Sequence, residues 1–435
     1  MSFETGTLKK EYLNPQNFIR NRSVEFKLPK NKVILSSIQL CNLGLFGVAN
    51  GRNMEETGVS SMIKKISLLC KGQELSKTNE ANVVLNMLKQ VNNSNRQANY
   101  VELVGGDLGN RGFIVQHLGN DANEFRKYNR NQVFADQTEV NELLTGTGRI
   151  ALMDVLPILR SIRVLDTNVL MDLSIRIEFE DNLNNYNPGT AVQNNQNITR
   201  PKLVYTCLYD DKVIKQNKEL GGYNSKQGLL WNEYETDSYV VDVNDGGRTS
   251  NGALVRQTTN VKLNGFQNKF VNRMAIINTY LAPQQGSIAL PVANNNGRAG
   301  NLNSIVFPQQ TLQININGSN LFNGSGLDKQ ASINREFIET WGDVSTALGV
   351  SDITTPFSGT YFQGLDNSRD KMSKGYMGFS VLQNVRDLQI TYSRSGCQDN
   401  STANGFHNEG IRAVVVGEVM KRMVINDGMP IVYYE

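Results

Sequence analysis

The chain has 435 residues, which is more than one hydrophobic core usually organises, and this length predicts two domains. Hydrophobic residues make up 39% of the sequence and charged residues 20%, which is typical of a soluble globular protein. The net charge of +3 is small for this length, so it argues against a strongly basic nucleic-acid-binding protein and leaves only a local basic patch open.

Four basic side chains, Lys9, Lys10, Arg20 and Arg22, lie in or next to the N-terminal segment, residues 1–21. It has no apolar core, so it does not resemble a signal peptide. No apolar run in the chain approaches the roughly 20 residues that span a bilayer. We therefore expect an intracellular protein with an N-terminal arm, which is either a solvated tail or a segment that contacts a partner.

Short segments rich in valine, isoleucine, leucine and tyrosine dominate the rest of the chain, and clusters of glycine, asparagine and aspartate separate them. They predict strands at 23–28, 32–40, 63–70, 170–180, 201–209, 238–243, 311–316, 386–393 and 413–425. Helical periodicity is confined to 79–91 and 328–341. The apolar face of the first helix comprises Ala81, Val84, Leu85, Leu88 and Val91. Many strands with few helices predict sandwiches or barrels.

An asparagine-rich, proline-bounded segment at 184–201 predicts a linker between two domains. The expected division is an N-terminal arm at 1–21, a first domain at 22–188, a linker at 189–200 and a second domain at 201–435. Two further polar stretches, 91–132 and 343–375, are too long for simple hairpins. We expect them to be surface loops that project from the ends of the domains.

The two predicted domains share anchors at a constant separation. Gly318 follows Gly72 by 246 residues, and the triplet Asn-Gly-Arg at 296–298 follows the same triplet at 50–52 by 246. A strand with period-two apolar residues precedes each glycine, and a leucine follows it three residues later, ahead of a helical pattern. Two anchors at one separation, with strand and helix in the same order, predict an internal duplication.

Sequence motifs for catalysis and cofactor binding are weak. His117 and His407 lie in polar, glycine- and asparagine-rich surroundings without the nucleophile and carboxylate that a catalytic triad requires. Gly146 and Gly148 lack the third glycine of a dinucleotide-binding fingerprint, and no phosphate-binding loop motif occurs. Neither histidine nor this glycine pair is therefore predicted to form a site.

The acidic segment at 242–247 faintly resembles a calcium loop, but the position that needs glutamate holds Ala253, so we interpret the segment as a turn. Of the four widely spaced cysteines, Cys41 and Cys70 lie in apolar strands and are expected to be small buried hydrophobes without a disulfide. We predict no catalytic, cofactor-binding or metal site. Folding could still bring two acidic residues together as a catalytic pair.

The strand that ends in Gly-x-x-Leu, with its turns at Lys71-Gly72 and Asn317-Gly318, resembles a feature of one protein family. These are the double jelly-roll major capsid proteins of nucleocytoplasmic large DNA viruses, virophages and Polinton-like viruses. The resemblance covers about a third of the chain, and the low tryptophan content departs from the giant-virus members.

Two other segments carry the same resemblance. Residues 148–181, with Leu156-Pro157 before a long strand, are similar to the close of the family's first roll. The C-terminal segment 413–435, with Gly428 and a nearby tyrosine, resembles the family's ending.

The resemblance implies an all-β chain of two tandem eight-stranded antiparallel jelly rolls with short helices in the loops. It implies a non-enzymatic major capsid protein that forms homotrimers of near-hexagonal outline and assembles into an icosahedral shell. Implied partners are neighbouring capsomers, vertex and minor capsid proteins, and an internal membrane or the genome through the N-terminal arm. The implied location is the virion capsid, assembled inside the host cell.

Two alternatives stay open from the sequence. The first is a minor or vertex capsid protein, which would have a single roll and a different symmetry. The second is a carbohydrate-binding or hydrolytic β-sandwich protein, because jelly rolls also host lectins and enzymes. An exposed row of aromatic side chains or a close pair of carboxylates would favour the second alternative.

Overall fold

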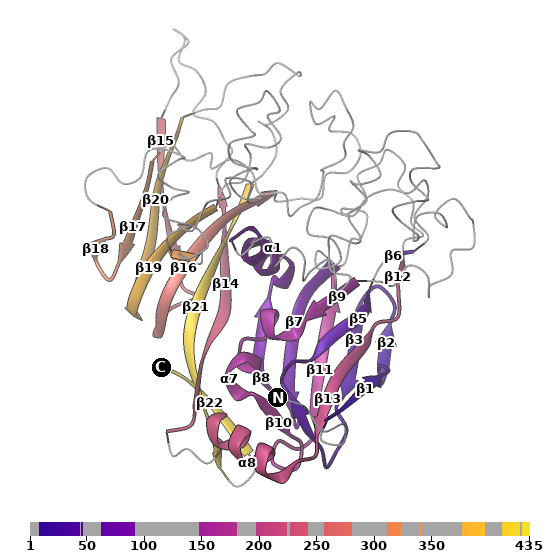
Figure 1. Ribbon diagram of the computed structural model, residues 1–435. Coiled ribbons are helices and arrows are strands. Elements are labelled where there is room, and N and C mark those ends of the chain that lie inside the picture. Colours follow the sequence, from indigo (N-terminus) through magenta and orange to yellow (C-terminus); the bar gives the residue numbers. More distant parts are fainter. Residues whose placement is uncertain are drawn as a thin grey trace, which may run out of the picture.

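The computed structural model describes residues 8–43, 45–46, 62–91, 148–180, 197–223, 227–241, 256–280, 311–322, 340–341, 376–395, 411–426 and 429–435. Antiparallel strands form two bodies, which we call roll one and roll two and which lie side by side in Figure 1. Four helices have both ends within the described residues: α1 (Ala81–Val91), α6 (Leu152–Val155), α7 (Ile158–Ile162) and α8 (Asp211–Leu220).

Roll one consists of two facing sheets. The first sheet has the order β1 (Leu8–Leu13), β13 (Lys202–Leu208), β5 (Gln39–Leu43), β9 (Gly148–Ala151), and β4 (Val33–Leu35) joins β13 to β10 (Val164–Asp166). The second sheet has the order β2 (Asn17–Ile19), β3 (Ser23–Lys27), β11 (Leu173–Phe179), β7 (Ile63–Cys70), β8 (Gln73–Asn79). A separate short pair joins β6 (Leu45–Phe46) to β12 (Asn197–Ile198).

Roll two also has two sheets. The first has the order β14 (Leu229–Val241), β21 (Ile411–Asn426), β16 (Lys269–Tyr280), β19 (Tyr376–Val385), and β22 (Met429–Tyr434) pairs with the end of β21. The second has the order β15 (Arg256–Leu263), β20 (Leu388–Ser395), β17 (Thr311–Ile316), β18 (Ser319–Asn320).

The two rolls have the same strand order. The eight main strands of roll one are, in chain order, β1, β3, β5, β7, β8, β9, β11 and β13, and those of roll two are β14 to β21. When the strands of each roll are numbered one to eight in this order, one sheet has the strand order 1-8-3-6 and the other has the order 2-7-4-5, in both rolls. This is the order of a jelly roll, in which Greek-key connections carry the chain between two antiparallel sheets. The structure therefore has the predicted fold of two tandem jelly rolls, and β7 and β17 occupy the same position in their rolls.

Of the two predicted pairs of repeat anchors, Gly72 and Gly318 lie in the same kind of turn, and the Asn-Gly-Arg triplets at 50–52 and 296–298 lie outside the described residues. Lys71 and Gly72 have φ angles of 50° and 81°, and Asn317 and Gly318 have φ angles of 54° and 85°. Two consecutive positive φ angles in a two-residue hairpin define a type I′ turn, whose twist matches that of the flanking strands. A Cβ at either glycine would meet no atom within 4 Å, so space is available for a side chain. The positive φ angle is therefore what favours glycine at these positions.

Replacing Gly72 or Gly318 with valine is expected to lower the free energy of unfolding by about 1–2 kcal/mol, because a branched side chain disfavours the left-handed conformation. Replacing Gly72 with asparagine, which tolerates this conformation, is the matched control and should cost much less. Chemical denaturation of the three variants measures both effects. Valine variants as stable as the parent chain would show that neither turn needs a positive φ.

The alternating pattern of the predicted strands corresponds to burial. Leu312, Ile314 and Ile316 are fully or almost fully buried in the core of roll two, and the side chains between them are only half-buried. The predicted helix at 79–91 is α1, which begins at Ala81. Val83 and Met87, outside its predicted apolar face, are also buried, so this helix is enclosed on more than one side.

The sheets of roll one include segments from both sides of the predicted linker. β13 lies after the linker but pairs with β1, β4 and β5, so roll one extends to Leu208 (Figure 1). The last strand of roll one is therefore β13, and β11, which the resemblance suggested as the last, is the seventh. The sequence also predicts an arm at 1–21, yet β1 and β2 are strands of roll one.

Candidate functional site at the junction of the two rolls

Most motifs weighed in the sequence fall outside the described residues. This is true of His117, His407, Cys397, the acidic segment 242–247 and most or all of the two long loops. Of the glycine pair, Gly148 is described and begins β9. The predicted burial of Cys41 and Cys70 is confirmed, and Cys207 is buried as well; all three are free thiols.

The described residues suggest a different candidate, the junction between the rolls. One hydrophobic core runs without a break from roll one into roll two. Roll two contributes side chains from four elements: Leu229, Trp231, Tyr234, Ala275, Ile277, Trp341, Val414, Val416 and Met423. A shared core of this kind fixes the two bodies to each other, because separating them would expose apolar surface to water. This exposure costs about 25 cal/mol of free energy for each Å².

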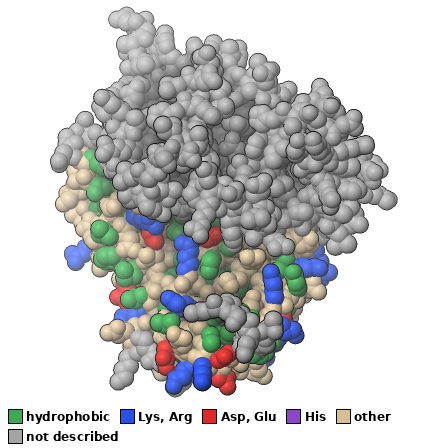
Figure 2. All heavy atoms as spheres, in the orientation of Figure 1, with side chains coloured by type: hydrophobic (Ala, Val, Ile, Leu, Met, Phe, Trp, Pro, Cys, Tyr) green, Lys and Arg blue, Asp and Glu red, His purple; other side chains and the backbone are tan. Residues whose placement is uncertain are grey.

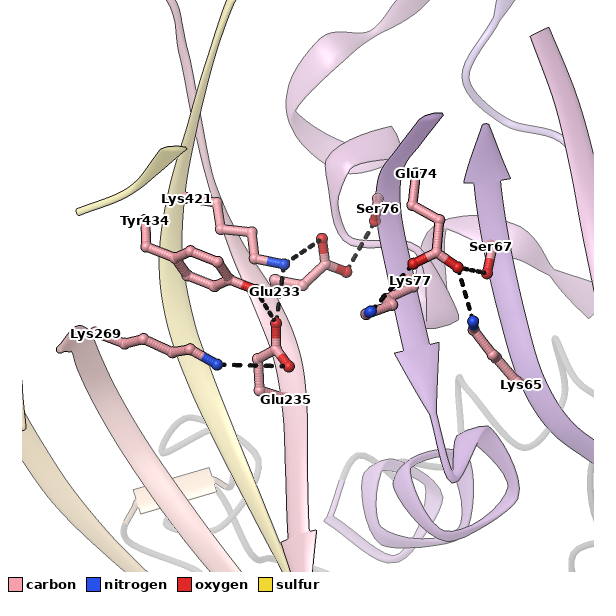
Figure 3. A network of polar contacts seen from close by, with 10 residues as sticks. All are labelled: Lys65, Ser67, Glu74, Ser76, Lys77, Glu233, Glu235, Lys269, Lys421 and Tyr434. Carbon is pink, nitrogen blue, oxygen red and sulfur yellow. Dashed lines mark hydrogen bonds and ion pairs between the residues drawn. The ribbon is translucent and has the colours of Figure 1, made fainter. Parts of the chain in front are cut away.

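A carboxylate lies inside this junction. Glu233 on β14 is fully buried, and each of its oxygens accepts a hydrogen bond (Figure 3). Ser76 Oγ on β8 of roll one donates to Oε1 at 2.8 Å, and Trp231 Nε1 donates to Oε2 at 2.9 Å. Burial raises the pKa of Glu233 to about 7, because loss of solvation disfavours the anion.

Glu235, two residues further along β14, is the better-paired carboxylate. Lys421 Nζ on β21 lies 2.9 Å from Glu235 Oε1 and 3.9 Å from Glu233 Oε2. Tyr434 Oη donates to Glu235 Oε1 at 2.9 Å, and Lys269 Nζ lies 3.9 Å from Glu235 Oε2. Burial favours a higher pKa for Glu235, but the two lysines outweigh it, and the pKa is lowered. Lys421 therefore acts mainly as the counter-ion of Glu235.

On the roll-one side, the same network continues along β7 and β8 (Figure 3). Glu74 accepts from Lys65 Nζ at 2.7 Å and from Ser67 Oγ at 3.2 Å, and Lys77 Nζ lies 3.1 Å from its other oxygen. Burial opposes ionisation of Glu74, but the two lysines lower its pKa to about 2. Glu74 is therefore ionised at neutral pH, whereas Glu233 is about half protonated there.

A second group of contacts also lies in the junction. Arg273 on β16 pairs with Glu418 on β21, and its guanidinium lies 4.3 Å from the ring centroid of Trp341. Arg412 donates to Glu80 of roll one at 3.0 Å. Cation–π contact and ion pairing in a partly desolvated setting contribute more than exposed pairs do, so these side chains reinforce the apolar junction.

Glu233 and Glu235 form the close pair of carboxylates that would favour a hydrolase. A glycoside hydrolase places two carboxyl groups on either side of a bond that solvent and substrate can reach. Glu233 has no accessible surface, and both of its oxygens are occupied by Ser76 and Trp231. The arrangement can hold two bodies together, but it offers no space for a substrate.

Roll one carries a related network on its first strand. Glu11 on β1 accepts from Lys32 Nζ at 2.7 Å and from Tyr205 Oη at 2.8 Å. These two hydrogen bonds lower the pKa of Glu11 to about 2. Lys9, one of the basic residues of the predicted arm, lies 3.4 Å from the same carboxylate. The described part of the N-terminal segment is therefore held on roll one by both backbone and side-chain contacts.

The described residues include no candidate metal cluster and no membrane-spanning helix. On the face drawn in Figure 2, basic and acidic side chains are interspersed among apolar ones. Among the described residues no group of three or more histidine, cysteine, aspartate or glutamate side chains could hold a metal ion. None of the helices within the described ranges is long and apolar enough to cross a bilayer.

No protein-family model matches the sequence, and no curated protein matches it. Solved structures do match over the whole chain. The capsid of the virus PBCV-1 contains a chain with a TM-score of 0.57 and 13% identity, and the match covers 100% of this chain and 99% of that chain. The mavirus major capsid protein matches with a TM-score of 0.50 and 9% identity, covering 100% and 91%.

A chain of the Sputnik virophage structure matches with a TM-score of 0.50 and 12% identity, covering 100% of this chain and 90% of that one. At these identities the likeness establishes the fold alone. The chain thus shares the double jelly-roll fold of these proteins, and the resemblance predicted from the turns and chain ends is confirmed at the level of fold.

Proposed function

We propose that this chain is a viral major capsid protein that forms homotrimers and assembles, without catalysis, into an icosahedral shell. The observation that carries the proposal is that two rolls of identical strand order are joined by one continuous core. Each chain is thereby a rigid pair of similar bodies. The likeness in fold to virus capsid chains supports the same assignment.

The duplicated architecture suits closed assembly. Three copies of a two-roll chain place six similar bodies around one axis, with about 60° between neighbours, as cyclic closure demands. In such a ring, roll one of each chain meets roll two of the next. Permanent contacts of this kind bury about 2,000–5,000 Å² and exclude water from an apolar centre. The small net charge of +3 opposes such packing only weakly.

The alternatives receive less support. Two rolls in one chain argue against a minor or vertex protein built on a single roll. The complete burial of Glu233 argues against the hydrolytic alternative. We assign the chain to the virion capsid, with neighbouring capsomers and vertex or minor capsid proteins as its partners.

Contacts with an internal membrane or the genome through an N-terminal arm form no part of this proposal. Lys9 and Lys10 lie in β1, and Arg20 and Arg22 lie in the turn between β2 and β3. All four are on the surface of roll one. Residues 8–21 therefore cannot reach away from the roll without breaking the pairing of β1 with β13 and of β2 with β3.

The proposal predicts a trimer in solution. Light scattering behind a sizing column should give about 146 kDa, three times the chain mass of 48.5 kDa. Electron microscopy of the same fraction should show particles of near-hexagonal outline. A mass of one chain at every concentration and salt condition would contradict the proposal, and a five-fold particle would favour the vertex alternative. Binding or hydrolysis of glycans by a monomer would favour the carbohydrate-active alternative.

A further inference from the structure

Glu233 is a titratable group that is completely buried in the junction. Its carboxyl group joins the rolls directly, because Ser76 belongs to β8 of roll one and Glu233 to β14 of roll two. The two residues are 157 positions apart in the chain, so this hydrogen bond exists only while the rolls are packed together. A change in the charge of Glu233 must therefore act on the junction.

The charged and titratable groups around Glu233 come from five strands, β8, β14, β16, β21 and β22 (Figure 3). On β21, Lys421 is 3.9 Å from Glu233 but only 2.9 Å from Glu235 on β14. Lys269 on β16 and Tyr434 on β22 contact Glu235, and on β8 Glu74 is paired with Lys77. When Glu233 is neutral, Lys421 and Glu235 form a balanced pair. When Glu233 is ionised, two carboxylates compete for one close ammonium.

The hydrogen bonds of Glu233 tolerate either protonation state. Serine hydroxyl groups both donate and accept, so Ser76 can donate to the carboxylate or accept from the protonated acid. Trp231 can only donate, and it does so to the other oxygen in either state. Protonation therefore changes the charge inside the junction without removing the contact between the rolls.

We propose that the Ser76–Glu233 pair is a proton-sensitive contact between the two rolls, in which the neutral acid holds the rolls together and the buried anion weakens their junction. Glu233 lies at the interface and is completely buried, and Lys421 is farther from it (3.9 Å) than from Glu235 (2.9 Å). The free-energy penalty of holding a carboxylate there without water exceeds its attraction to one ammonium group at this distance.

The direction of the pH dependence follows from the raised pKa. In the unfolded chain Glu233 titrates near the ordinary value of 4.5, and in the folded chain near 7. Its contribution to stability is complete below about pH 4.5 and is lost as the pH rises through about 7. Glu11 and Glu74, with folded pKa values of about 2, stay ionised in the folded chain throughout this range; their titration in the unfolded chain near pH 4.5 gives a slope of opposite sign, which the parent chain and a Glu233 variant share.

The test compares the parent chain with Glu233→Gln, a neutral isostere of the protonated acid. Between pH 5 and pH 8, the unfolding equilibrium constant of the parent should rise by roughly 10²-fold more than that of the variant, as measured by chemical denaturation. Both histidines are present in both proteins, so their titration cancels in the difference. Parallel pH profiles for the two proteins would overturn the proposal.

A local readout covers the case in which Glu233→Gln does not fold. Trp231 donates to Glu233, so tryptophan emission of the parent should titrate with a midpoint near pH 7. The Ser76→Ala variant lacks a hydrogen bond that favours the anion, and its midpoint should move to higher pH. Emission that does not titrate between pH 5 and 9, or a midpoint that Ser76→Ala leaves unchanged, would refute the proposal.

This inference does not depend on the capsid assignment. All three measurements concern the stability and emission of the chain itself, and the trimer mass is measured separately. A chain that never trimerises could still show the pH difference, and a trimer could lack it.

Discussion

Replacing Gly417 with valine is expected to prevent roll two from folding stably. Gly417 lies in the middle of β21, opposite Glu235 on β14 and Met274 on β16, so the backbone is held by strands on both sides. A Cβ at this position would overlap Phe266 Cε1 and lie 2.9 Å from Phe266 Cδ1. Phe266 is itself fully buried in the core of roll two.

The expected cost follows from overpacking. Adding a methyl group in a packed core costs typically about 1–3 kcal/mol, so Gly417→Ala should fall in this range and Gly417→Val should exceed it. Chemical denaturation or thermal unfolding measures both. Combining Gly417→Ala with Phe266→Leu should cost less than the sum of the two single changes, because the smaller side chain leaves room. Additive costs would show that Phe266 is not what excludes the side chain.

Replacing Lys421 with methionine is expected to destabilise the chain by about 3–5 kcal/mol, the usual cost of removing one partner of a buried ion pair. The side chain of Lys421 is 6% exposed, and its ammonium group serves Glu233 and Glu235. Without it, both carboxyl groups stay in the junction with only Lys269 nearby, at 3.9 Å from Glu235. Their pKa values should rise, so the loss should be larger at pH 8 than at pH 5.

Lys269→Met is the matched control, since Lys269 sits on the neighbouring strand but at a longer distance from Glu235. It should cost clearly less than Lys421→Met. Adding Glu235→Gln to Lys421→Met should restore part of the stability, because it removes the unpaired charge. Equal costs for the two lysine variants would show that proximity to the buried carboxylates does not set the effect.

The sequence predicts well those strands whose apolar residues alternate or run together. The predicted segments 63–70 and 311–316 coincide with β7 and β17, and 413–425 lies within β21. Their side chains face a core, so burial imposes the pattern that the sequence displays. The constant separation of the two type I′ turns also revealed the duplication, because positive φ at two consecutive residues selects for glycine at the second.

Other elements carry no such pattern. β15, β16 and β19 were not predicted, nor was the first half of β14, which contains Glu233 and Glu235. The segment 32–40 was predicted as one strand, but it divides into β4 and the start of β5. Between them the Ser36 amide donates to Arg163 on another part of roll one, a contact that local sequence cannot indicate.

The sequence by itself determined the strand-rich class, the repeated turn and the division into two similar domains, because local backbone geometry and the alternation of apolar residues depend on neighbouring positions. The tertiary structure alone decided that β13 closes roll one and that Glu233 meets Ser76 inside the junction. Strand partners and the burial of a charged residue depend on packing between segments far apart in the chain. A glutamate in a polar strand therefore resembles a surface residue until a second roll covers it.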